Sequence, residues 1–354
     1  AARRVDDPFA FGAPAVQIEW ADEHDPPLQS AKTAMESLIE RLRPDAIVVH
    51  SALDAGVLSA ARGASRMVVH LHDHRAFCPN GDRVYPRGGH ICAKPMGTAC
   101  VVHSLTNGCA YGPRLRTLKL IARRHLVRDR IAAADRIVVL SDYMVRLAVL
   151  NGCAPNRILI LDPPLADDAF RDQPFEQPIA NQILFIGRVV PQKGLRSLIR
   201  ALAKVNDSTR PHLQIAGEGP ELAAALADAA ALRVRVTTLG ALDAAGIRDA
   251  IDGARMVVMP SLWGEPFGLV GIESLARGRP VVAYDSGAIN EWLGEAGRLV
   301  PRGDEPALAR AIESLADEVI WKAAATKGRE ASARYDLQRH IERLMELYGT
   351  PRAL

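Results

Sequence analysis

The sequence has no long apolar run. None of its hydrophobic stretches approaches the ~20 residues that a membrane span needs, and no secretory signal is visible. The 44 Lys and Arg residues nearly balance the 41 Asp and Glu residues, so the net charge of +3 is far below that of a dedicated nucleic-acid binder. We therefore expect a cytoplasmic protein without a nucleic-acid partner, whose mild positive charge suits small acidic ligands.

Cysteine is scarce, and no Cys-x-x-Cys pair occurs. Five cysteines in 354 residues argue against a disulfide-rich secreted fold, and Cys153 is typical of a small buried apolar residue. The other four lie in the Gly- and Pro-rich stretch 72–113 and are Cys78, Cys92, Cys100 and Cys109. Their spacing is unusual for zinc, yet four thiols binding one structural Zn²⁺ would staple so long a loop. Reduced thiols or a transient disulfide are the alternatives.

Three signatures of nucleotide or metal chemistry are also absent. There is no Gly-x-x-x-x-Gly-Lys-Ser/Thr loop, which excludes a P-loop nucleotidase. No Gly-x-Gly-x-x-Gly opens a helix after a strand, which disfavours an NAD-dependent dehydrogenase. No Asp-x-Asp triplet occurs, so no metal-binding motif for catalysis is present.

Short apolar runs alternate with amphipathic stretches along the chain. The runs are continuous and do not alternate with polar residues, which predicts strands buried on both faces of parallel sheets. We expect strands at 47–49, 67–71, 137–140, 158–161, 183–186, 213–216, 234–239, 256–259, 281–284 and 299–300. Helices are expected at 31–42, near 114–133, from about 142 and between the strands that follow 183. The fold class is α/β with two doubly wound, Rossmann-like domains that face each other across a cleft.

Prolines divide the chain. Pro163, Pro164, Pro174 and Pro178 mark 162–181 as the interdomain linker. We expect an N-terminal acceptor-side domain at 1–165 that carries the cysteine loop, a C-terminal donor-binding domain at 182–330, and a helix at 331–354 that packs back toward the N-terminal domain.

Glycines follow the first two strands expected in the C-terminal domain, 183–186 and 213–216, and basic residues follow the first of them. The loop from Gly187 to Gly194 places Arg188 and Lys193 at a helix N-terminus, where free N–H groups and two positive charges suit a diphosphate. Gly217-Glu218-Gly219-Pro220 repeats a strand-end turn in which a backbone can approach a ligand. Taken alone, either stretch is also compatible with an ordinary tight turn.

A third stretch, 260–273, is the most informative. Glu265 and Glu273 stand eight residues apart, one before a helix and one on its first turns. Backbone N–H groups near Gly268 lie between them, so two carboxylates can bind hydroxyls at opposite ends of a ligand whose middle is anionic. The alternative is a helix cap and a solvated helical residue.

These motifs together resemble the donor-binding domain of glycosyltransferase family 4, whose members are retaining enzymes of the GT-B fold. The resemblance covers 183–300 and rests on the stretches 185–194, 215–220, 260–268 and 273–282. It implies that Arg188 and Lys193 bind the donor diphosphate, Glu273 the ribose and Glu265 the transferred sugar. The remaining donor-binding positions it implies are Gly187, Gly217, Gly240, Phe267, Gly268, Leu269 and Val270.

The N-terminal half matches this family less densely. The strand end Val68–Asp73 resembles its His-Asp element, which makes His72 a catalytic residue beside the sugar, together with Arg188, Lys193 and Glu265. The first plausible strand, Val16–Trp20, leads directly to the helix 31–42. The family's first strand, Gly-rich loop and helix are therefore missing, and we expect a truncated N-terminal domain.

The implied activity is metal-independent transfer of a hexose from a UDP-, GDP- or ADP-sugar to a hydroxyl acceptor. The acceptor is a glycan, a lipid-linked sugar or a small molecule, as in polysaccharide biosynthesis, and no cofactor is required. A nucleotide-sugar epimerase and a non-catalytic donor-binding subunit remain alternatives. The basic helix near 114–130, with Leu115, Leu118, Ile121, Leu126 and Val127 on its apolar side, suggests peripheral contact with the inner membrane face, or an ordinary solvated helix.

Overall fold

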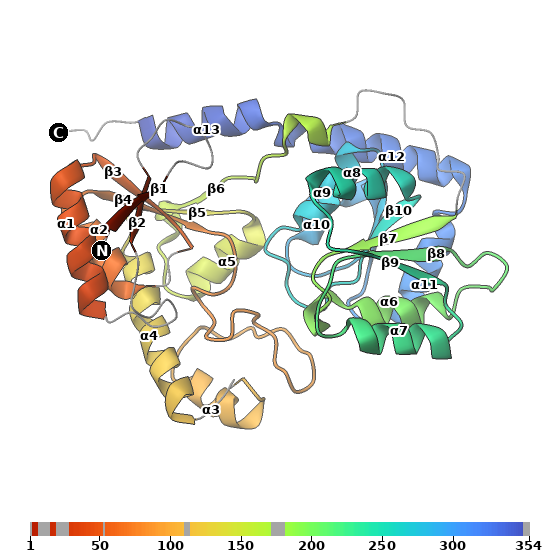
Figure 1. Cartoon of the computed structure of the whole chain (residues 1–354), viewed down its shortest axis with the longest axis horizontal. Helices are drawn as coiled ribbons and strands as arrows, with labels where there is room; N and C mark the ends of the chain where they lie inside the picture. Colours follow the sequence, from red (N-terminus) through yellow and green to blue (C-terminus); the bar gives the residue numbers. More distant parts are fainter. Residues whose placement is uncertain are drawn as a thin grey trace. The chain divides into compact units, whose positions relative to one another are not determined.

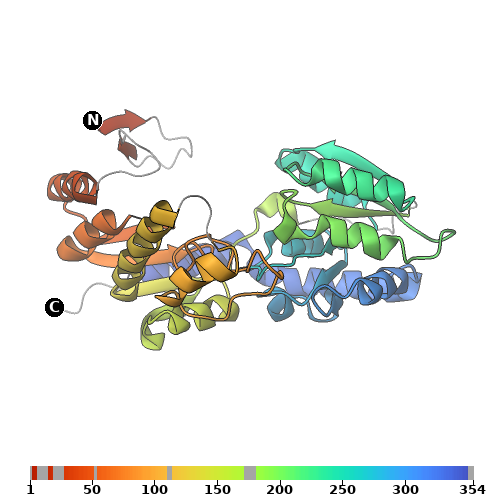
Figure 2. The same cartoon turned by 90° about the horizontal axis from the view of Figure 1, so that it is seen from below.

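The chain folds into two compact units. The computed structural model describes residues 2–5, 15–18, 28–51, 54–109, 114–170 and 181–349. Unit 1 comprises 1–81, 94–138 and 147–159, and unit 2 comprises 82–93, 139–146 and 160–354 (Figures 1 and 2). The predicted α/β class with two Rossmann-like domains is confirmed. Among the helices that the structure describes, none is long and apolar enough to cross a membrane.

A four-stranded sheet forms the centre of unit 1. Its order is β3-β4-β5-β6, and β3 and β4 pair in parallel from Ala46 opposite Arg66 to His50 opposite His70. The strands are β3 (Ala46–His50), β4 (Arg66–Leu71), β5 (Arg136–Val139) and β6 (Ile158–Ile160). The helices along this part of the chain are α1 (Leu28–Leu42), α2 (Ala55–Ala64), α3 (Ala99–Thr106), α4 (Arg114–Ala132) and α5 (Asp142–Leu150).

Unit 2 contains a six-stranded parallel sheet in the order β12-β11-β10-β7-β8-β9. Its strands are β7 (Gln182–Ile186), β8 (His212–Ala216), β9 (Val236–Gly240), β10 (Met256–Met259), β11 (Val281–Tyr284) and β12 (Gly297–Val300). Its helices are α6 (Leu195–Leu202), α7 (Leu222–Ala231), α8 (Ala244–Gly253), α9 (Leu269–Ala276), α10 (Ile289–Trp292), α11 (Glu305–Ser314), α12 (Glu318–Ser332) and α13 (Leu337–Gly349). This strand order is that of a doubly wound dinucleotide-type domain, in which the chain starts at the centre and winds outward in both directions.

Successive residues of the central strands enter two separate cores. Ile183 and Phe185 of β7 pack on the face covered by α6, α7 and α11, while Leu184 packs on the face with α8 and α9. Figure 1 shows these two helix layers on opposite sides of the sheet. Because side chains alternate along a strand, a strand that is apolar at every position fills both cores.

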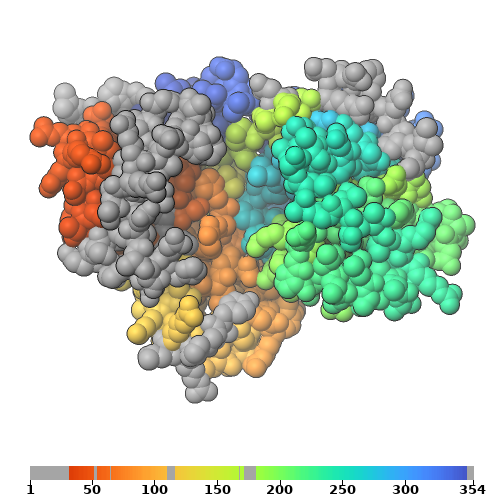
Figure 3. Space-filling model, in the orientation of Figure 1, coloured from red at the N-terminus to blue at the C-terminus, as the bar shows by residue number. Residues whose placement is uncertain are grey.

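The edge strands depart from this expectation. Val48 of β3 is 39% exposed and Leu299 of β12 is 38% exposed, although both were predicted to be buried on either face. At the other edge of unit 2, Thr237 and Thr238 of β9 are exposed. Figure 3 shows the green and teal part of the chain at the surface. An edge strand has a neighbour on one side only, so the burial prediction holds for the central strands and is wrong at the edges.

Some local expectations need correction. The stretch 72–113 contains the helix α3 and an isolated antiparallel bridge between Val84 and Ile91, so it is not wholly irregular. The helix α2 was not predicted. The predicted strand 16–20 appears as β2 (Ala15–Ile18), paired antiparallel with β1 (Ala2–Val5), and Trp20 lies outside the described residues. Most of the predicted linker, 171–180, also lies outside them.

The basic helix α4 buries part of the apolar side that the sequence indicated. Thr117, Ile121 and Val127 are at most 5% exposed, whereas Leu118 and Leu126 are 44% and 43% exposed. Arg123 forms an ion pair with Asp54 at 3.7 Å. Arg residues therefore help fix α4 in unit 1, and two of its leucines are left in solvent.

The helix α13 contacts the segment that follows β6. Arg343 donates a hydrogen bond to the Ile160 carbonyl at 3.0 Å, and His340 Nδ1 lies 2.8 Å from the Asp162 carbonyl oxygen. Residues 160–165, which we assigned to the N-terminal domain, belong to unit 2 in this division. The predicted domain boundaries and the packing of 331–354 toward the first domain stay predictions.

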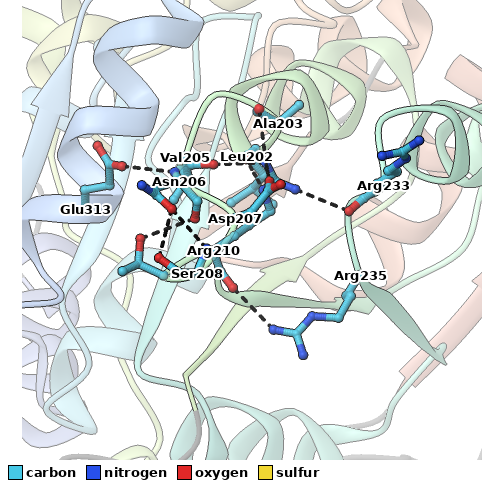
Figure 4. A network of polar contacts seen from close by, with 11 residues as sticks. Leu202, Ala203, Val205, Asn206, Asp207, Ser208, Arg210, Arg233, Arg235 and Glu313 are labelled. Atoms are coloured by element: carbon cyan, nitrogen blue, oxygen red, sulfur yellow. Dashed lines mark hydrogen bonds and ion pairs between the residues drawn. The ribbon is translucent and has the colours of Figure 1, made fainter.

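One arginine closes the C-terminal end of α6. Arg210 donates hydrogen bonds to the carbonyls of Leu202, Ala203 and Val205 at 2.8, 3.2 and 2.9 Å, and Figure 4 shows its side chain reaching these carbonyls. The last carbonyls of a helix have no partner within the helix, and a positive charge there also complements the helix dipole. Arg210 thus links the end of α6 to the chain that enters β8.

We expect Arg210→Ala to lower the free energy of unfolding by about 2 kcal/mol, because it removes the hydrogen bonds of the guanidinium group to three carbonyls. Urea unfolding followed by circular dichroism measures the change. Arg235→Ala is the matched control, since its side chain is exposed and makes one long hydrogen bond of 3.4 Å to the Arg210 carbonyl. Equal losses in both variants would contradict the role of Arg210.

Candidate active site

The strand order of unit 2 marks where a ligand binds. β7 and β10 are neighbours, and from them the chain winds in opposite directions across the sheet. The loops that follow such a pair diverge and leave a crevice at the carboxyl ends of the strands. These loops are 187–194 and 260–268, which carry the first and third sequence motifs. The topology therefore brings the two motifs to one edge.

Glycine makes the first loop possible. Gly194 has φ +70°, and a Cβ there would lie 1.9 Å from the Pro260 carbonyl oxygen of the second loop. Gly187 has φ +144°. The two glycines let the chain turn from β7 into α6 while Lys193 stays half-buried and Arg188 exposed. The loops after β7 and β10 are thereby in direct backbone contact, which only a residue without a side chain allows.

The loop after β8 is joined to the first. Val189 N–H donates to the Glu218 carbonyl at 2.8 Å, and Gly217 N–H donates to the Gly240 carbonyl at 2.7 Å. A Cβ at Gly217 would lie 2.0 Å from the Gly187 carbonyl oxygen. The three predicted donor-binding glycines at 187, 217 and 240 therefore belong to three consecutive loops that touch one another.

A buried ion pair links the first and third motifs. Lys193 Nζ lies 2.7 Å from Glu265 Oε1, and Ser261 Oγ donates to the same oxygen at 2.5 Å. Glu265 is 3% exposed. A carboxylate so deeply buried requires a charge partner and hydrogen bonds, and it has both on Oε1. Among the hydrogen bonds of the described residues, none involves Oε2, so this atom is available for a ligand hydroxyl.

The backbone around Glu265 is fixed from the other side by the loop that follows β11. Ala288 N–H donates to the Glu265 carbonyl at 2.9 Å, and Gly287, with φ +70°, has no room for a Cβ, which would lie 2.3 Å from Glu265 backbone atoms. Trp263, whose ring centroid is 5.3 Å from Lys193 Nζ, completes the surroundings. Sequence reasoning did not assign Ser261, Trp263 or Gly287 to the site. For Gly287, the available signal was the dipeptide Ser286-Gly287 shortly after the buried strand β11.

The start of α9 is built for backbone recognition. Gly268 has φ +102° and is the N-cap, and the helix begins at Leu269. Phe267 is 4% exposed, its carbonyl accepts a hydrogen bond from Trp292 Nε1 at 2.7 Å, and its ring meets Tyr335 edge-on. Its side chain is therefore part of the core, and only its main chain can reach a ligand. Leu269, which is 47% exposed, starts the row of amides that a helix N-terminus offers to anions.

Glu273 differs from Glu265 in its surroundings. It lies half-buried on α9, and among the described residues no ion pair or hydrogen bond of its carboxylate is recorded. Burial raises the pKa of the Glu273 carboxyl above its ordinary value. A carboxylate that is partly desolvated and has no protein partner is poised to accept hydrogen bonds from a ligand.

A serine that follows β5 also reaches this part of unit 2. Ser141 Oγ donates to the Pro266 carbonyl at 2.6 Å, and the amides of Asp142 and Tyr143 donate to the Glu291 carboxylate at 2.8 and 2.6 Å. The carboxylate of Glu291 thus caps the N-terminus of α5. The sequence predicted the strand 137–140 that precedes Ser141 but not the hydrogen bond from this serine to the Pro266 carbonyl.

His72 lies in unit 1, in a group of three histidines. His50 Nδ1 and His72 Nε2 share a hydrogen bond of 2.9 Å, and the His70 ring stacks on His50 with centroids 4.5 Å apart. Burial lowers the pKa of His50. Burial also lowers the pKa of His72, assisted by His50 and Arg75 and opposed by Asp73. The sequence predicted His72 but not its two neighbours.

The four loop cysteines are not gathered in the same way. Within the part of the chain that the structure describes, one group of at least three His, Cys, Asp or Glu side chains has metal-binding proximity, and it is the histidine group. Cys78, Cys92, Cys100 and Cys109 are all half-buried. The structural zinc ion therefore stays a prediction. Burial raises the pKa of the Cys153 thiol to about 12, as expected for a small buried apolar residue.

The comparison with known families bears on the site just described. Residues 180–318 match the model of the family "Glycosyl transferases group 1". These residues form a group 1 glycosyltransferase domain. The match includes all of the donor-binding positions predicted from the motifs, from Gly187 to Glu273, and the resemblance to family 4 is confirmed at the level of the family.

Curated relatives match between about half and two thirds of this chain. A phosphatidyl-myo-inositol mannosyltransferase of Mycobacterium leprae is 36% identical over 177 residues, 49% of this chain and 47% of the relative. An alpha-D-kanosaminyltransferase of Streptomyces kanamyceticus is 30% identical over 245 residues, 64% of this chain and 62% of the relative. The chain thus spans between about half and two thirds of the length of these relatives.

Solved structures share the fold of the whole chain. A sucrose-phosphate synthase from Thermosynechococcus elongatus has a TM-score of 0.67 at 21% identity, covering 91% of this chain and 77% of that one. The Anabaena protein Alr3699/HepE, solved in complex with UDP, has a TM-score of 0.68 at 18% identity, covering 91% and 81%. At these identities the likeness establishes the two-domain fold of which the group 1 domain is one half.

The raised pKa of the half-buried Glu273 carboxyl allows a test of the site that needs no ligand. At a pH below its pKa in the unfolded chain, Glu273 is protonated in both the folded and the unfolded state. At a pH above its raised pKa in the folded protein, it is ionised in both states. The free energy of unfolding therefore falls as the pH rises between these two pKa values. We therefore expect Glu273→Gln to unfold at a higher temperature than the wild type at pH 7 and at the same temperature near pH 4. Calorimetric melting at both pH values measures this, and a gain that is independent of pH would contradict it.

Proposed function

We propose that this protein is a retaining, metal-independent glycosyltransferase that moves a hexose from a nucleoside diphosphate sugar to a hydroxyl acceptor. The observation that carries the proposal is the pair of unlike carboxylates on the loop and helix after β10. Glu265 is buried and anchored by Lys193 and Ser261, whereas Glu273 has no recorded protein partner. Such a pair suits a ligand with hydroxyls at both ends, as in a nucleotide sugar with its ribose and its hexose.

The middle of that ligand carries the charge. When the bond between the sugar C1 and the diphosphate breaks, negative charge develops on the leaving oxygens. Arg188, the ammonium group of Lys193 and the amides at the start of α9 lie at the same edge of the sheet and supply positive potential there. These groups provide the stabilisation that a divalent cation supplies elsewhere, which is the basis for proposing metal-independent transfer.

The acceptor side is inferred from the relatives. One is named a phosphatidyl-myo-inositol mannosyltransferase and another an alpha-D-kanosaminyltransferase. We propose a glycan or a lipid-linked sugar as the acceptor, used in polysaccharide biosynthesis on the cytoplasmic side. The role of His72 beside the transferred sugar rests on the family resemblance. Neither an epimerase nor a non-catalytic subunit is favoured by these names.

The donor is identified by calorimetry. UDP, GDP and ADP are each titrated in the presence of EDTA, with NAD as a non-donor control. We expect one diphosphate to bind and Glu273→Ala to weaken it by about tenfold or more, because two ribose hydroxyls lose their acceptor. Glu295→Ala, which removes another carboxylate from unit 2 outside the site, is the matched control. Binding of no diphosphate, or binding indifferent to Glu273, would overturn the proposed site.

The stereochemical outcome is tested separately. With the donor identified, the product of transfer to a hydroxyl acceptor is analysed by proton NMR. Retention of the anomeric configuration supports the proposal, whereas inversion, or interconversion of the free donor into its epimer, contradicts it. A Glu265→Gln variant is expected to lose transfer while still binding the diphosphate, since Glu265 lies at the sugar end of the site.

We also propose that α4 rests on the anionic surface of a membrane, which suits a lipid-linked acceptor. Leu118, Ala122 and Leu126 are exposed and spaced by four residues along the helix, so they form one stripe. Lys119 and Arg130, also exposed, flank it. This combination of an apolar stripe with basic neighbours is typical of helices that lie in the lipid headgroup region.

Sedimentation with vesicles checks this contact. We expect the protein to bind vesicles that contain an anionic phospholipid more tightly than neutral ones, and added salt to weaken binding. The double substitution Lys119→Glu and Arg130→Glu should weaken it by about tenfold or more. Lys204→Glu, an exposed lysine of unit 2, is the matched control. Equal affinity for neutral vesicles would contradict an electrostatic contact.

A further inference from the structure

We propose that His50, His70 and His72 form a binding site for a divalent transition-metal ion in unit 1. This site uses none of the loop cysteines, and its existence does not depend on the proposed transfer reaction. Each histidine offers one ring nitrogen, and the three nitrogens lie within 4.8 Å of one another.

The sheet itself assembles the cluster. β3 and β4 pair in parallel, with His50 directly opposite His70. Neighbouring strands lie about 4.8 Å apart, so side chains at opposite positions on one face are in contact. His72 follows His70 by two residues, and residues spaced by two point to the same face. The paired strands therefore place His50 and His70 on one face of the sheet at its carboxyl end, and His72 lies one residue beyond the end of β4.

The rings already point their nitrogens at one another. The centroids of His50 and His72 are 5.2 Å apart, their planes differ by 8°, and the facing nitrogens are 2.9 Å apart. Two rings with these values are nearly coplanar, and the hydrogen bond runs in the ring plane. That is the direction of the imidazole lone pair, which is also the direction along which a metal ion is bound.

Metal binding replaces this hydrogen bond while both imidazole rings stay neutral. One facing nitrogen carries the shared proton and the other the lone pair. Transfer of that proton, through solvent, to the other nitrogen of its own ring leaves two facing lone pairs and two neutral rings. In a tetrahedral site with metal–nitrogen distances of about 2.1 Å, the nitrogens are roughly 3.4 Å apart. The 2.9 Å pair therefore has to open slightly and His70 has to approach, which small rotations of the rings achieve.

The surroundings select the class of ion. The nearest carboxylate in sequence, Asp73, is engaged by Arg75 Nε at 2.6 Å, so it does not join the ligand set and it offsets the charge of that arginine. Three neutral imidazoles suit Zn²⁺, Ni²⁺, Cu²⁺ or Co²⁺ and do not suit Mg²⁺ or Ca²⁺, which prefer oxygen. His70 is 5% exposed, whereas His50 and His72 are exposed. The ion can therefore enter from solvent and keep water on its open side.

Occupancy has a consequence for the reaction, and this part rests on the proposed function. A metal ion bound to His72 withdraws that side chain from the transferred sugar. Micromolar concentrations of a transition metal would then inhibit transfer, although the reaction itself uses none, and EDTA would restore it.

Cobalt titration of the full chain tests the site. We expect one Co²⁺ to bind with the visible absorption of a low-coordinate cobalt complex and without the near-ultraviolet band of a thiolate ligand. His50→Ala should weaken binding by about tenfold or more, since loss of a ligand costs at least as much as loss of a residue that supports one. His90→Ala, an exposed histidine of unit 2, is the matched control and should bind as the wild type does. His50 is exposed, so its replacement leaves the core intact.

The outcomes separate the site from the function. Failure to bind cobalt, an unchanged affinity in His50→Ala, or a strong thiolate band would each overturn the histidine site and leave the proposed transfer untouched. Binding that depends on His50 supports the site. If such binding has no effect on transfer, the role of His72 beside the sugar is contradicted and the metal site stands.

Discussion

The architecture of the site depends on keeping one carboxylate charge inside the protein. Glu265 is almost completely buried, and its negative charge is tolerated because Lys193 and Ser261 converge on one of its oxygens. Those two residues come from the loops after β7 and β10. The pair therefore ties together the two loops at which the sheet reverses its winding. Removing Lys193 would leave the buried Glu265 charge without a compensating charge, so the positions of the two loops and the ion pair depend on one another.

The second carboxylate shows the opposite arrangement. Glu273 is half-buried, and no partner of its carboxylate is seen among the described residues. Burial raises the pKa of its carboxyl, which means that the ionised form lowers the stability of the fold. A structure selected for stability alone would place a neutral residue at this position of α9. Glu265 is thus held rigidly for orientation, whereas Glu273 is left for a ligand to satisfy. This division of labour explains why two chemically identical side chains, eight residues apart, differ so much in their surroundings.

Much of the fold could be predicted from the sequence, because central strands that serve two cores are apolar at every position. Residues 183–186 and 256–259 are examples, and each was placed to within one residue. Edge strands were harder, since Val48 and Leu299 are as apolar as core residues although one side of each is in solvent. The helix α2 was missed, and on the apolar side predicted for α4 Ile121 and Val127 are buried whereas Leu118 and Leu126 are exposed. Apolar character alone does not reveal which face of a helix meets a neighbour.

Site residues that lie within one sequence motif could be predicted. Contacts between residues that are far apart in the sequence could not. Lys193, Glu265 and Glu273 were found from local spacing. The hydrogen bond from Ser141 to Pro266 joins residues far apart in the sequence. The alignment of His50 with His70 depends on the register of β3 against β4. Neither relation leaves a local signature, and only the folded chain reveals them.

The close backbone contacts at glycine also limit how this protein can change. At Gly194, Gly217 and Gly287 a single added carbon atom would lie 2.3 Å or less from a carbonyl oxygen of a neighbouring loop. Variation in donor preference therefore has to arise from side chains that line the crevice, because substitution of these glycines would displace the backbone that forms it. A library that randomises the exposed positions around Arg188 and Leu269 would retain most of its folded members, whereas one that includes these glycines would lose them.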